Sequence, residues 1–465
     1  MFRTRIRTGS KLLRHITEKF QSRIETRTVP PLHFRKDMEC IRKGDWKAAP
    51  TPTPLQCRHV ELTGPGNDAK MVINAMNSKA DGYMFDLEDS MAPTRFNVQR
   101  AHHNLRQLVA GTLCHSTADR TYRIESTRPP TLSVRVRGLH MRQGGVSAML
   151  YDICEFMEHS AWPLLESGRG PFLYIPKLET YEDSLFVDDV LSECEKQLSL
   201  PHGSTKTTVL IETFPSIFQT DEIIYAQKDR LVGLNCGRWD YLFSMIKYNP
   251  DILFPDREQL SMDKRFLKEY VLEIVNTCHK RDVHAMGGMS AFIPTPGRDI
   301  AETLRRDKIL ELQRGCDGAW VAHPGMIEQV QGIFRSGLNG ASHQKHRRPS
   351  LATRRTFLEV SGTVTKQSFE SNVKASLFYL DAWLQGHGAV AYNGMMEDLA
   401  TFEIAAQQLN NWCAHGAALA PTGTVVTTQL LFSSIDNENY PDKTSNLLKK
   451  YVTGNYNFLG DVVVP

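Results

Sequence analysis

Apolar and polar positions follow two alternating periods along most of the chain. Eight short apolar stretches end in turn residues, and most of them precede a segment with 3.6-residue periodicity, such as 217–226 or 266–279. The eight stretches are residues 57–63, 82–88, 131–137, 171–177, 207–213, 231–236, 284–289 and 318–323. Strands that alternate with helices build a parallel sheet, and eight such units in about 280 residues predict an α/β fold, a closed (β/α)8 TIM barrel. An open doubly wound sheet is the weaker alternative, because no Gly-x-Gly-x-x-Gly motif follows an early strand.

Helical periodicity prevails before and after the predicted barrel. Leu12, Leu13, Ile16 and Phe20 share one face of a predicted helix at residues 10–20. Two later helices carry apolar residues at intervals of three and four, through Val373, Leu377, Leu380 and Leu384 and through Phe402, Ala405, Leu409 and Trp412. We therefore divide the chain into an N-terminal helical segment (1–54), the barrel (55–338), a basic linker (339–356) and a C-terminal helical domain (357–465).

Basic residues mark the start of the chain and the linker. The first 17 residues contain no acid and five basic residues, Arg3, Arg5, Arg7, Lys11 and Arg14. Such a start also occurs in mitochondrial presequences, but a basic surface helix, Ser10 to Phe20, is the favoured interpretation. The chain ends Val-Val-Val-Pro, without a Ser-Lys-Leu-type peroxisomal address. We expect an organellar matrix, mitochondrial or peroxisomal by another route, with the cytoplasm as the alternative. In the linker, the pattern Arg347-Arg348-Pro349-Ser350 leaves phosphorylation of Ser350 open.

The composition is that of an ordinary globular protein. Hydrophobic residues make up 41% of the 465 residues and charged residues 23%. The net charge of +3 is too small to indicate a nucleic-acid partner, and no apolar run reaches the ~18 residues that a membrane helix needs. The nine cysteines are odd in number and widely spaced, with no C-x-x-C pair, which argues against a disulfide framework or a zinc site.

Acidic residues gather where the barrel strands are predicted to end. In a TIM barrel, side chains at the carboxyl ends of the strands form the active site. Glu212 and Asp240 lie 28 residues apart, about one repeat, and two such carboxylates can hold Mg²⁺ together with water and a substrate oxygen. Salt bridges are the alternative for this pair. Asp86, Glu88 and Asp89 add acids at the same mouth, and clustered carboxylates need a compensating cation, which favours a metal.

Three further features at the predicted mouth have two interpretations each. Residues 233–240 are rich in small side chains before a helix, so their backbone N–H groups could hold a carboxylate or merely form a tight turn. Arg135 and Arg137 are two residues apart, so both side chains point into the barrel unless the strand ends before Arg137. These arginines could belong to the site or form salt bridges on the outside of the barrel, and both interpretations stay open. Asp398 stands at the expected start of a helix, where an acid also complements the helix dipole.

Several long motifs occur in a fixed order along the chain. They are Arg42-Lys-Gly-Asp-Trp-Lys47, Thr63-Gly-Pro65, Val209-Leu-Ile-Glu-Thr-Phe-Pro215, Gly233-Leu-Asn-Cys-Gly-Arg-Trp-Asp-Tyr241, Ala285-Met-Gly-Gly-Met289, Trp320-Val-Ala-His-Pro-Gly325 and Met396-Glu-Asp398. Together they resemble the malate synthase family, in the shorter A form of the glyoxylate cycle. The likeness runs from about residue 9 to about residue 415.

The resemblance implies a TIM barrel with a C-terminal helical plug over its mouth. It also implies condensation of acetyl-CoA with glyoxylate, followed by hydrolysis to malate and CoA. Carried over motif by motif, Glu212 and Asp240 hold Mg²⁺, which polarises the glyoxylate aldehyde. Asp398 is the base that removes a proton from the acetyl methyl group, and Arg135 stabilises the enolate oxygen.

The remaining expected positions surround this centre. The glyoxylate carboxylate is expected on Gly237, Arg238, Trp239 and Asp240, and Asp86 and Glu88 are expected beside the metal, with Glu88 holding a metal-bound water. The expected partners are acetyl-CoA and glyoxylate, and a homo-oligomer is the alternative to a monomer.

Two departures from the family pattern keep other functions open. Val136 replaces the proline usual between the two arginines, and Thr295-Pro-Gly-Arg298 replaces a segment with a CoA-binding lysine. One alternative is a lyase that cleaves malyl-CoA or citramalyl-CoA, since Asp86-Leu-Glu-Asp89 also resembles the citrate-lyase β-subunit relatives. Those relatives usually lack the long helical plug. The other alternative is a non-catalytic CoA-binding homologue.

Overall fold

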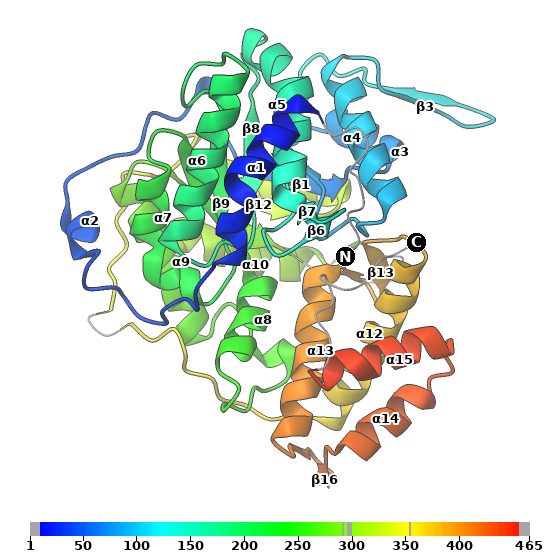
Figure 1. Cartoon of the computed structure of the whole chain (residues 1–465). Coiled ribbons are helices and arrows are strands. Elements are labelled where there is room, and N and C mark those ends of the chain that lie inside the picture. The colour runs from blue at the N-terminus through cyan, green and yellow to red at the C-terminus, as the bar shows by residue number, and fades with distance from the viewer. Residues whose placement is uncertain (1–9, 291–292, 295–299, 353–354, 455–465) are drawn as a thin grey trace.

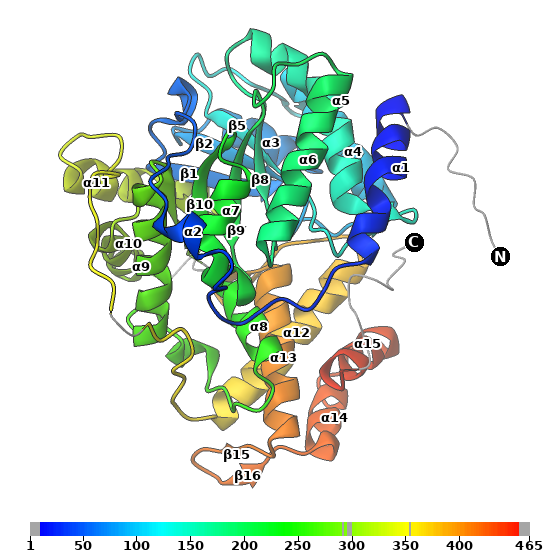
Figure 2. The ribbon, with the colours of Figure 1, turned by 60° about the vertical axis from the view of Figure 1, so that its left-hand side comes forward.

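The eight predicted strands form the closed barrel. The structure, a computed structural model, describes residues 10–290, 293–294, 300–352 and 355–454. The strands are parallel, and in barrel order they are β1 (Val60–Pro65), β12 (Gly318–Val321), β11 (His284–Met289), β10 (Leu231–Cys236), β9 (Lys206–Ile211), β8 (Phe172–Ile175), β5 (Thr131–Arg135) and β2 (Gly82–Asp86). Figures 1 and 2 show the sheet enclosed by helices. The predicted (β/α)8 TIM barrel is therefore confirmed.

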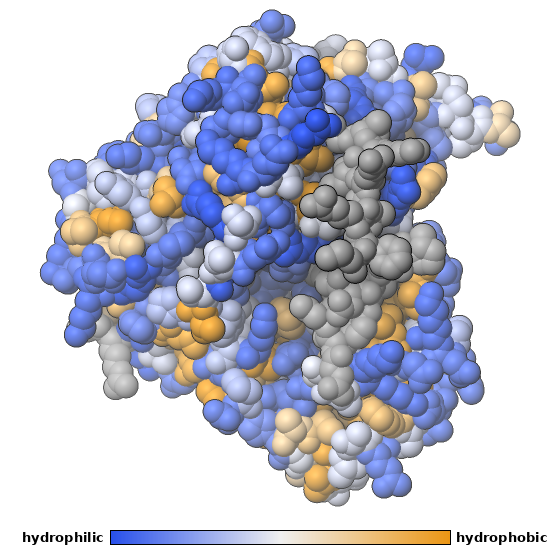
Figure 3. All heavy atoms as spheres, in the orientation of Figure 1, coloured by the Kyte–Doolittle hydropathy of each residue, from blue (hydrophilic) through white to orange (hydrophobic). Residues whose placement is uncertain are grey.

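Helices follow the strands and cover the barrel. They are α3 (Ala69–Met76), α4 (Arg95–Val109), α5 (Ala148–Glu166), α6 (Tyr181–Gln197), α7 (Thr220–Ala226), α8 (Arg238–Tyr248), α9 (Arg265–Lys280), α10 (Ala301–Arg314) and α11 (Ile327–Gly337). Their apolar faces pack on strands that are buried on both sides, as a parallel barrel requires. The face drawn in Figure 3 is accordingly mostly hydrophilic, with small separate apolar groups.

Short elements connect these units. Two hairpins in the barrel part of the chain were not predicted, β3 (Cys114–Ser116) with β4 (Thr121–Arg123) and β6 (Arg142–Gln143) with β7 (Val146–Ser147). The first projects from the body of the molecule in Figure 1. Single 3-10 turns are η1 (Thr53–Leu55), η2 (Pro215–Gln219), η3 (Arg257–Gln259) and η4 (Pro324–Met326). No helix within the described ranges has both the length and the apolar character that a bilayer crossing requires.

Side chains fill the barrel axis below the mouth. Arg58 lies inside the barrel and donates from Nε to Glu61 Oε1 (2.7 Å), from Nη2 to Tyr174 (2.6 Å) and from Nη1 to Thr208 (3.1 Å). Trp320 closes this layer and donates to Glu61. Because the axis is packed in this way, the carboxyl ends of the strands are where this fold binds a ligand.

The N-terminal segment packs against the side of the barrel. It contains α1 (Lys11–Glu25) and α2 (Glu39–Lys43). The predicted apolar face of α1 is buried, and its Phe20 packs edge-on against Phe186 of α6 at 5.9 Å. Ser10 caps the helix by accepting from the Leu13 amide. The residues at 1–9, which hold Arg3, Arg5 and Arg7, lie outside the described part of the chain.

Part of the linker is buried against the barrel. Its described residues form no helix or strand, and Ser350 is exposed. Gln344 and Lys345 are buried, however, because the Gln344 amide donates to Asp317 at 2.7 Å and Lys345 reaches Asp282 at the foot of the barrel. The sequence could not show this, since a polar residue bonded to the barrel has the same sequence pattern as a solvated one.

A helical unit lies against the barrel mouth. It comprises α12 (Lys366–Leu384), β13 (Val390–Tyr392), β14 (Met395–Glu397), α13 (Leu399–Ala414), β15 (Ala418–Leu419), β16 (Thr424–Val425), α14 (Thr428–Asp436) and α15 (Asp442–Val452). Figure 2 shows α13 running from its outer end up to the barrel. Trp412 of α13 donates to the Phe254 carbonyl (2.7 Å), and Gln408 donates to the Pro255 carbonyl (2.7 Å). These bonds place the start of α13 over the carboxyl ends of the strands.

Candidate active site

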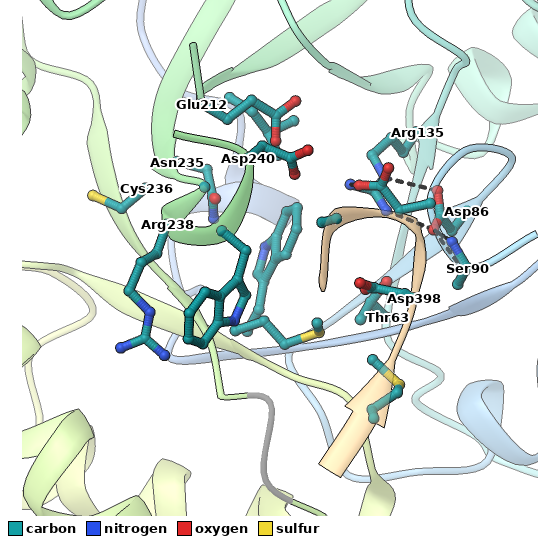
Figure 4. Close-up of a pocket in the computed structure, with 18 residues that line it drawn as sticks. Thr63, Asp86, Ser90, Arg135, Glu212, Asn235, Cys236, Arg238, Asp240 and Asp398 are labelled. Atoms are coloured by element: carbon teal, nitrogen blue, oxygen red, sulfur yellow. Dashed lines mark hydrogen bonds and ion pairs between the residues drawn. The ribbon is translucent and has the colours of Figure 1, made fainter. Parts of the chain in front are cut away.

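One pocket at the barrel mouth collects most of the predicted site residues. It has an empty volume of about 510 Å³ and lies between the strand ends and the start of α13. Its lining includes Asp86, Asp89, Arg135, Glu212, Gly237, Arg238, Trp239, Asp240 and Asp398. Figure 4 shows Glu212 and Asp240 on one side, Arg135 and Asp86 on another, and Asp398 facing the space between them.

Arg135 is held rigidly by two acids. Its Nε and Nη2 donate to the two oxygens of Asp86 at 2.7 and 2.6 Å, and its Nη1 donates to Asp89 at 2.8 Å (Figure 4). Asp86 also accepts from the amides of Glu88 and Ser90, which folds the loop after β2 around it. Asp86 therefore positions Arg135, and this bidentate pairing fixes the guanidinium plane.

The second arginine does not join the site. Strand β5 ends at Arg135, so Arg137 is free to turn outward, where it is bonded to Asp152 of α5 (2.8 Å from Nε and 2.7 Å from Nη2). Of the two alternatives for Arg135 and Arg137, the one in which the strand ends before Arg137 is correct.

Glu212 and Asp240 come from neighbouring repeats, as predicted. Glu212 directly follows β9, and Asp240 lies in the first turn of α8, which follows β10. Gly237 allows them to approach, because a Cβ at that position would lie 2.5 Å from Glu212 Cβ and 2.7 Å from its Oε2. Glu212 Oε1 accepts from the Lys177 amide (2.8 Å), whereas Oε2 accepts no hydrogen bond from any described residue.

Lys177 is a buried cation among the candidate site residues that the sequence did not reveal. It lies after β8, and its Nζ is 2.8 Å from Asp89, 3.2 Å from Glu88 and 3.3 Å from Asp240. Burial alone would lower the pKa of Lys177, but Asp240 and the other carboxylates outweigh it and raise that pKa well above its usual value. Its place at the end of a predicted strand, 171–177, was the signal that could have revealed it.

Two cations, Arg135 and Lys177, do not neutralise all of these acids. Burial is the largest cause that raises the pKa of Glu212 to about 8 and that of Asp240 to about 6. Burial and the charge of Asp89 raise the pKa of Glu88 well above its usual value, and neither carboxyl oxygen of Glu88 accepts a hydrogen bond from the described residues. Buried carboxylates left in this state mark a site that can accept further positive charge.

Asp398 enters the pocket from the helical unit. It is the N-cap of α13, where its Oδ1 accepts from the Thr401 amide (3.1 Å) and its own amide donates to the Thr401 hydroxyl (2.8 Å). Burial, and next the charge of Asp89, raise the pKa of Asp398 to about 8. The capping role and the site role therefore coexist, and a carboxyl with a pKa near neutrality is suited to proton transfer.

The predicted substrate-binding stretch is brought to the pocket by the start of α8. Gly237 is the N-cap residue, no side chain caps this helix, and the residues at its start line the pocket. The Arg238 side chain turns away from Glu212 and Asp240 in Figure 4 and lies 3.7 Å from Asp307. Trp239 lines the pocket. The departure at 295–298 lies outside the described residues.

A second pocket shares Glu212 and Asp240 with the first. Its lining also includes Lys177, Lys247 and Glu403. Glu403 belongs to α13, is buried, and was not singled out from the sequence. Burial raises the pKa of Glu403 to about 8, and its Oε2 accepts no hydrogen bond from the described residues.

Comparisons with known proteins agree with this geometry. The family described as "Malate synthase, TIM barrel domain" matches residues 131–359, and "Malate synthase, C-terminal" matches residues 363–458. The chain is 40% identical to the malate synthase of Myxococcus xanthus (strain DK1622) over 423 residues, 87% of this chain and 78% of that protein. It is 37% identical to malate synthase A of Escherichia coli (strain K12) over 437 residues, 90% of this chain and 81% of that protein.

A solved structure has the same fold. It is a malate synthase of Haloferax volcanii in a ternary complex with pyruvate and acetyl-CoA. The TM-score is 0.53 and the sequence identity 18%, over 86% of this chain and 96% of that one. At this identity the likeness concerns the fold alone.

Proposed function

The chain belongs to the malate synthase family, as its motifs indicated, and we propose that it condenses acetyl-CoA with glyoxylate, and releases malate and CoA, in the pocket between the barrel and α13. The observation that carries this assignment is the meeting of two groups from separate parts of the chain. Asp398 comes from the helical unit, and it shares one pocket with Arg135, Glu212 and Asp240 of the barrel.

The carboxylates of Glu212 and Asp240 would hold Mg²⁺. The donors fit this ion, because Glu212 offers an oxygen that no described residue satisfies, and oxygen ligands are what Mg²⁺ prefers. The raised pKa values of both acids also support a bound cation, since an added positive charge favours their charged forms. Bound there, Mg²⁺ supplies Lewis-acid polarisation of the glyoxylate aldehyde.

The start of α8 binds the glyoxylate carboxylate in this proposal. Its first amides lack a side-chain cap, and the positive end of a helix dipole favours an anion. The backbone of Gly237 to Asp240 thus orients the substrate, while the Arg238 side chain is directed to Asp307. This places the aldehyde between the metal ligands and Asp398.

Asp398 takes the proton from the acetyl methyl group. Its pKa of about 8 in the ligand-free pocket makes it a stronger base, once ionised, than an exposed carboxylate. Arg135 stabilises the negative charge that develops on the thioester oxygen, and Asp86 and Asp89 hold its guanidinium in place beforehand. The carbanion then attacks the aldehyde carbon, and water cleaves the malyl thioester.

The division of the chain supports this mechanism. We propose that residues 55–338 supply the metal and glyoxylate site, and that the C-terminal domain, 357–465, supplies the base, joined by the linker at 339–356. Residues 1–54 are attached to the barrel through α1. The Leu399 amide donates to the Asp89 carbonyl at 3.3 Å, so the two halves of the site are in direct contact.

CoA thiol release from the purified chain tests the assignment. Acetyl-CoA is supplied with and without glyoxylate, and with Mg²⁺ or EDTA. Release that requires both glyoxylate and Mg²⁺ is expected. Cleavage of malyl-CoA without condensation would assign a lyase, and no reaction at all would assign a non-catalytic homologue. Ultracentrifugation of the same preparation distinguishes a homo-oligomer from a monomer.

We also propose that the basic start of the chain is an organellar leader. Because α1 packs on α5 and α6, a removable leader would have to end before Ser10. Residues 1–9 fused to a fluorescent protein should direct it to mitochondria. Retention of the fusion in the cytoplasm, with the full chain in peroxisomes or cytoplasm, would overturn this.

A further inference from the structure

Three potential metal ligands meet at the opposite end of the barrel from the active site. Cys57 and His59 precede β1, and Asp81 directly precedes β2, so all three lie at the amino ends of the strands. One ligand atom from each lies within 4.8 Å of the other two. His59 is buried, and Cys57 and Asp81 are half-buried, so an ion could reach them from solvent.

Local chain geometry brings Cys57 and His59 together. Arg58 between them points into the barrel, where it is bonded to Glu61 and Tyr174. Its two neighbours in an extended segment therefore face the other way. The His59 ring stacks on Phe334 of α11, with centroids 6.3 Å apart and an interplanar angle of 17°.

The hydrogen bond of His59 leaves one ring nitrogen free. Its Nε2 lies 3.1 Å from the Ala341 carbonyl, which can only accept, so Nε2 carries the proton. The lone pair is then on Nδ1. Histidines that bind metals usually donate their other ring N–H to a carbonyl or carboxylate in this way, because it fixes the tautomer and the ring orientation.

Hydrogen bonds also fix the position of the Asp81 carboxylate. Its Oδ2 accepts from the Val60 amide (2.9 Å), its Oδ1 accepts from Gln331 of α11 (3.3 Å), and its own amide donates to the Val60 carbonyl (2.9 Å). Each carboxylate oxygen has two lone-pair sites, so capacity for an ion remains. These bonds hold the carboxylate beside the two residues that precede β1.

We propose that Cys57, His59 and Asp81 bind a zinc-class divalent ion, with water as the fourth ligand. A thiolate, an imidazole and a carboxylate suit Zn²⁺ or Co²⁺, whereas Mg²⁺ and Ca²⁺ favour oxygen alone. A tetrahedral ion with bonds of about 2.0–2.3 Å spans ligand atoms about 3.3–3.8 Å apart, which is within the limit observed here. On binding, the Cys57 thiol releases its proton and its sulfur bonds to the metal.

The role of this site is to stabilise the foot of the barrel. Through its ligands and their hydrogen bonds, one ion would join the starts of β1 and β2 to α11 and to residue 341 in the linker. The amino end of a TIM barrel contributes to stability, and the reaction takes place at the other end. The site is thus independent of the proposed function and of its Mg²⁺.

Cobalt binding to the purified full-length chain tests the proposal. The metal-stripped protein, kept in excess Mg²⁺ to occupy the oxygen site, is titrated with Co²⁺. One equivalent should produce a thiolate-to-cobalt charge-transfer band and intense tetrahedral visible bands, and Zn²⁺ should remove both. The bands should be absent in C57S and unchanged in C114S, a matched loss of an exposed cysteine elsewhere. Wild-type protein without the charge-transfer band would overturn the proposal, and so would an unaltered band in C57S.

Thermal unfolding supplies a second measurement. Zn²⁺ should raise the melting temperature of wild type and C114S but not that of C57S, H59Q or D81N. CoA release should stay at the wild-type rate in C57S, because Cys57 is outside the active site. If C57S fails to fold, H59Q and D81N carry the same comparison. A Zn²⁺-induced shift that persists in all three folded variants would contradict the site.

Discussion

The mouth and the axis of the barrel both contain buried charged side chains, but the two regions differ in how completely these charges are paired. On the axis, Arg58 is fully paired with Glu61, Tyr174 and Thr208. At the mouth, Glu212 and Glu88 keep oxygens without a hydrogen bond from the described residues, and their pKa values are raised. A paired buried charge maintains structure, whereas an under-compensated one costs stability and is retained where chemistry needs it.

The largest expected effect is on turnover, at the mouth. D398N should reduce CoA release by about 10²–10⁴-fold, because general-base catalysis contributes that much and the amide cannot take a proton. Asn is as good an N-cap as Asp, so α13 should remain intact. Steady-state kinetics, with Mg²⁺ affinity from calorimetry as control, measure this. Near-normal turnover would show that Asp398 is not the base.

The next prediction compares the free energy of unfolding after a buried cation is removed from each region. R58M and K177M each remove a buried cation and should each cost about 3–5 kcal/mol of unfolding free energy without metal, because acids are left unpaired. Mg²⁺ should recover part of the loss in K177M and none in R58M. Denaturant midpoints with and without Mg²⁺ measure this. Equal responses of the two variants would remove the distinction between the regions.

Metal affinity should change by a smaller amount. D240N keeps the shape of a proposed ligand but removes its charge, and we expect Mg²⁺ to bind about 100-fold more weakly, roughly 2.7 kcal/mol. D256N offers a control, because Asp256 is also buried but binds Thr365 and the 363–365 segment. Calorimetric titration compares the three proteins. Unchanged Mg²⁺ affinity in D240N would take Asp240 out of the metal site.

Per pH unit, the smallest expected effect is the pH dependence of stability. With the Glu212 pKa raised from 4.5 to about 8, the metal-free folded chain holds a proton that the unfolded chain releases. Stability should therefore fall as pH rises between about 4.5 and 8, by at most ~1.4 kcal/mol per pH unit for this group. Melting temperatures in EDTA measure the slope. Mg²⁺ or the variant E212Q should flatten it, and a rising slope would contradict the shift.

Much of the fold follows from local pattern. The eight apolar stretches became the eight barrel strands because parallel strands buried on both faces need continuous apolar runs. The helices at 366–384 and 399–414 followed from spacing of three and four. The hairpin at 114–123 was missed, since each of its strands has only three residues, mostly exposed, which is too short for a periodic pattern to be recognised.

Part of the candidate site could be predicted because the carboxyl ends of the barrel strands converge at one mouth. Glu212, Asp240, Arg135 and Asp398 were named from motifs and do line one pocket. Lys177 was missed because its role depends on three acids from two other segments. The cysteine spacing argued against a zinc site, and the proposed one escaped notice because Asp81 lies 22 residues beyond His59 in sequence.

By itself, the sequence determined the barrel, the helical plug and the identity of the acids and the arginine at the mouth. These depend on hydrophobic period and motif order, which are local. Only the tertiary structure decided which charges are compensated, that Arg137 turns outward while Arg135 stays, and that Asp398 reaches the barrel. Those outcomes depend on burial and on distances between segments remote in sequence, and no local pattern contains them.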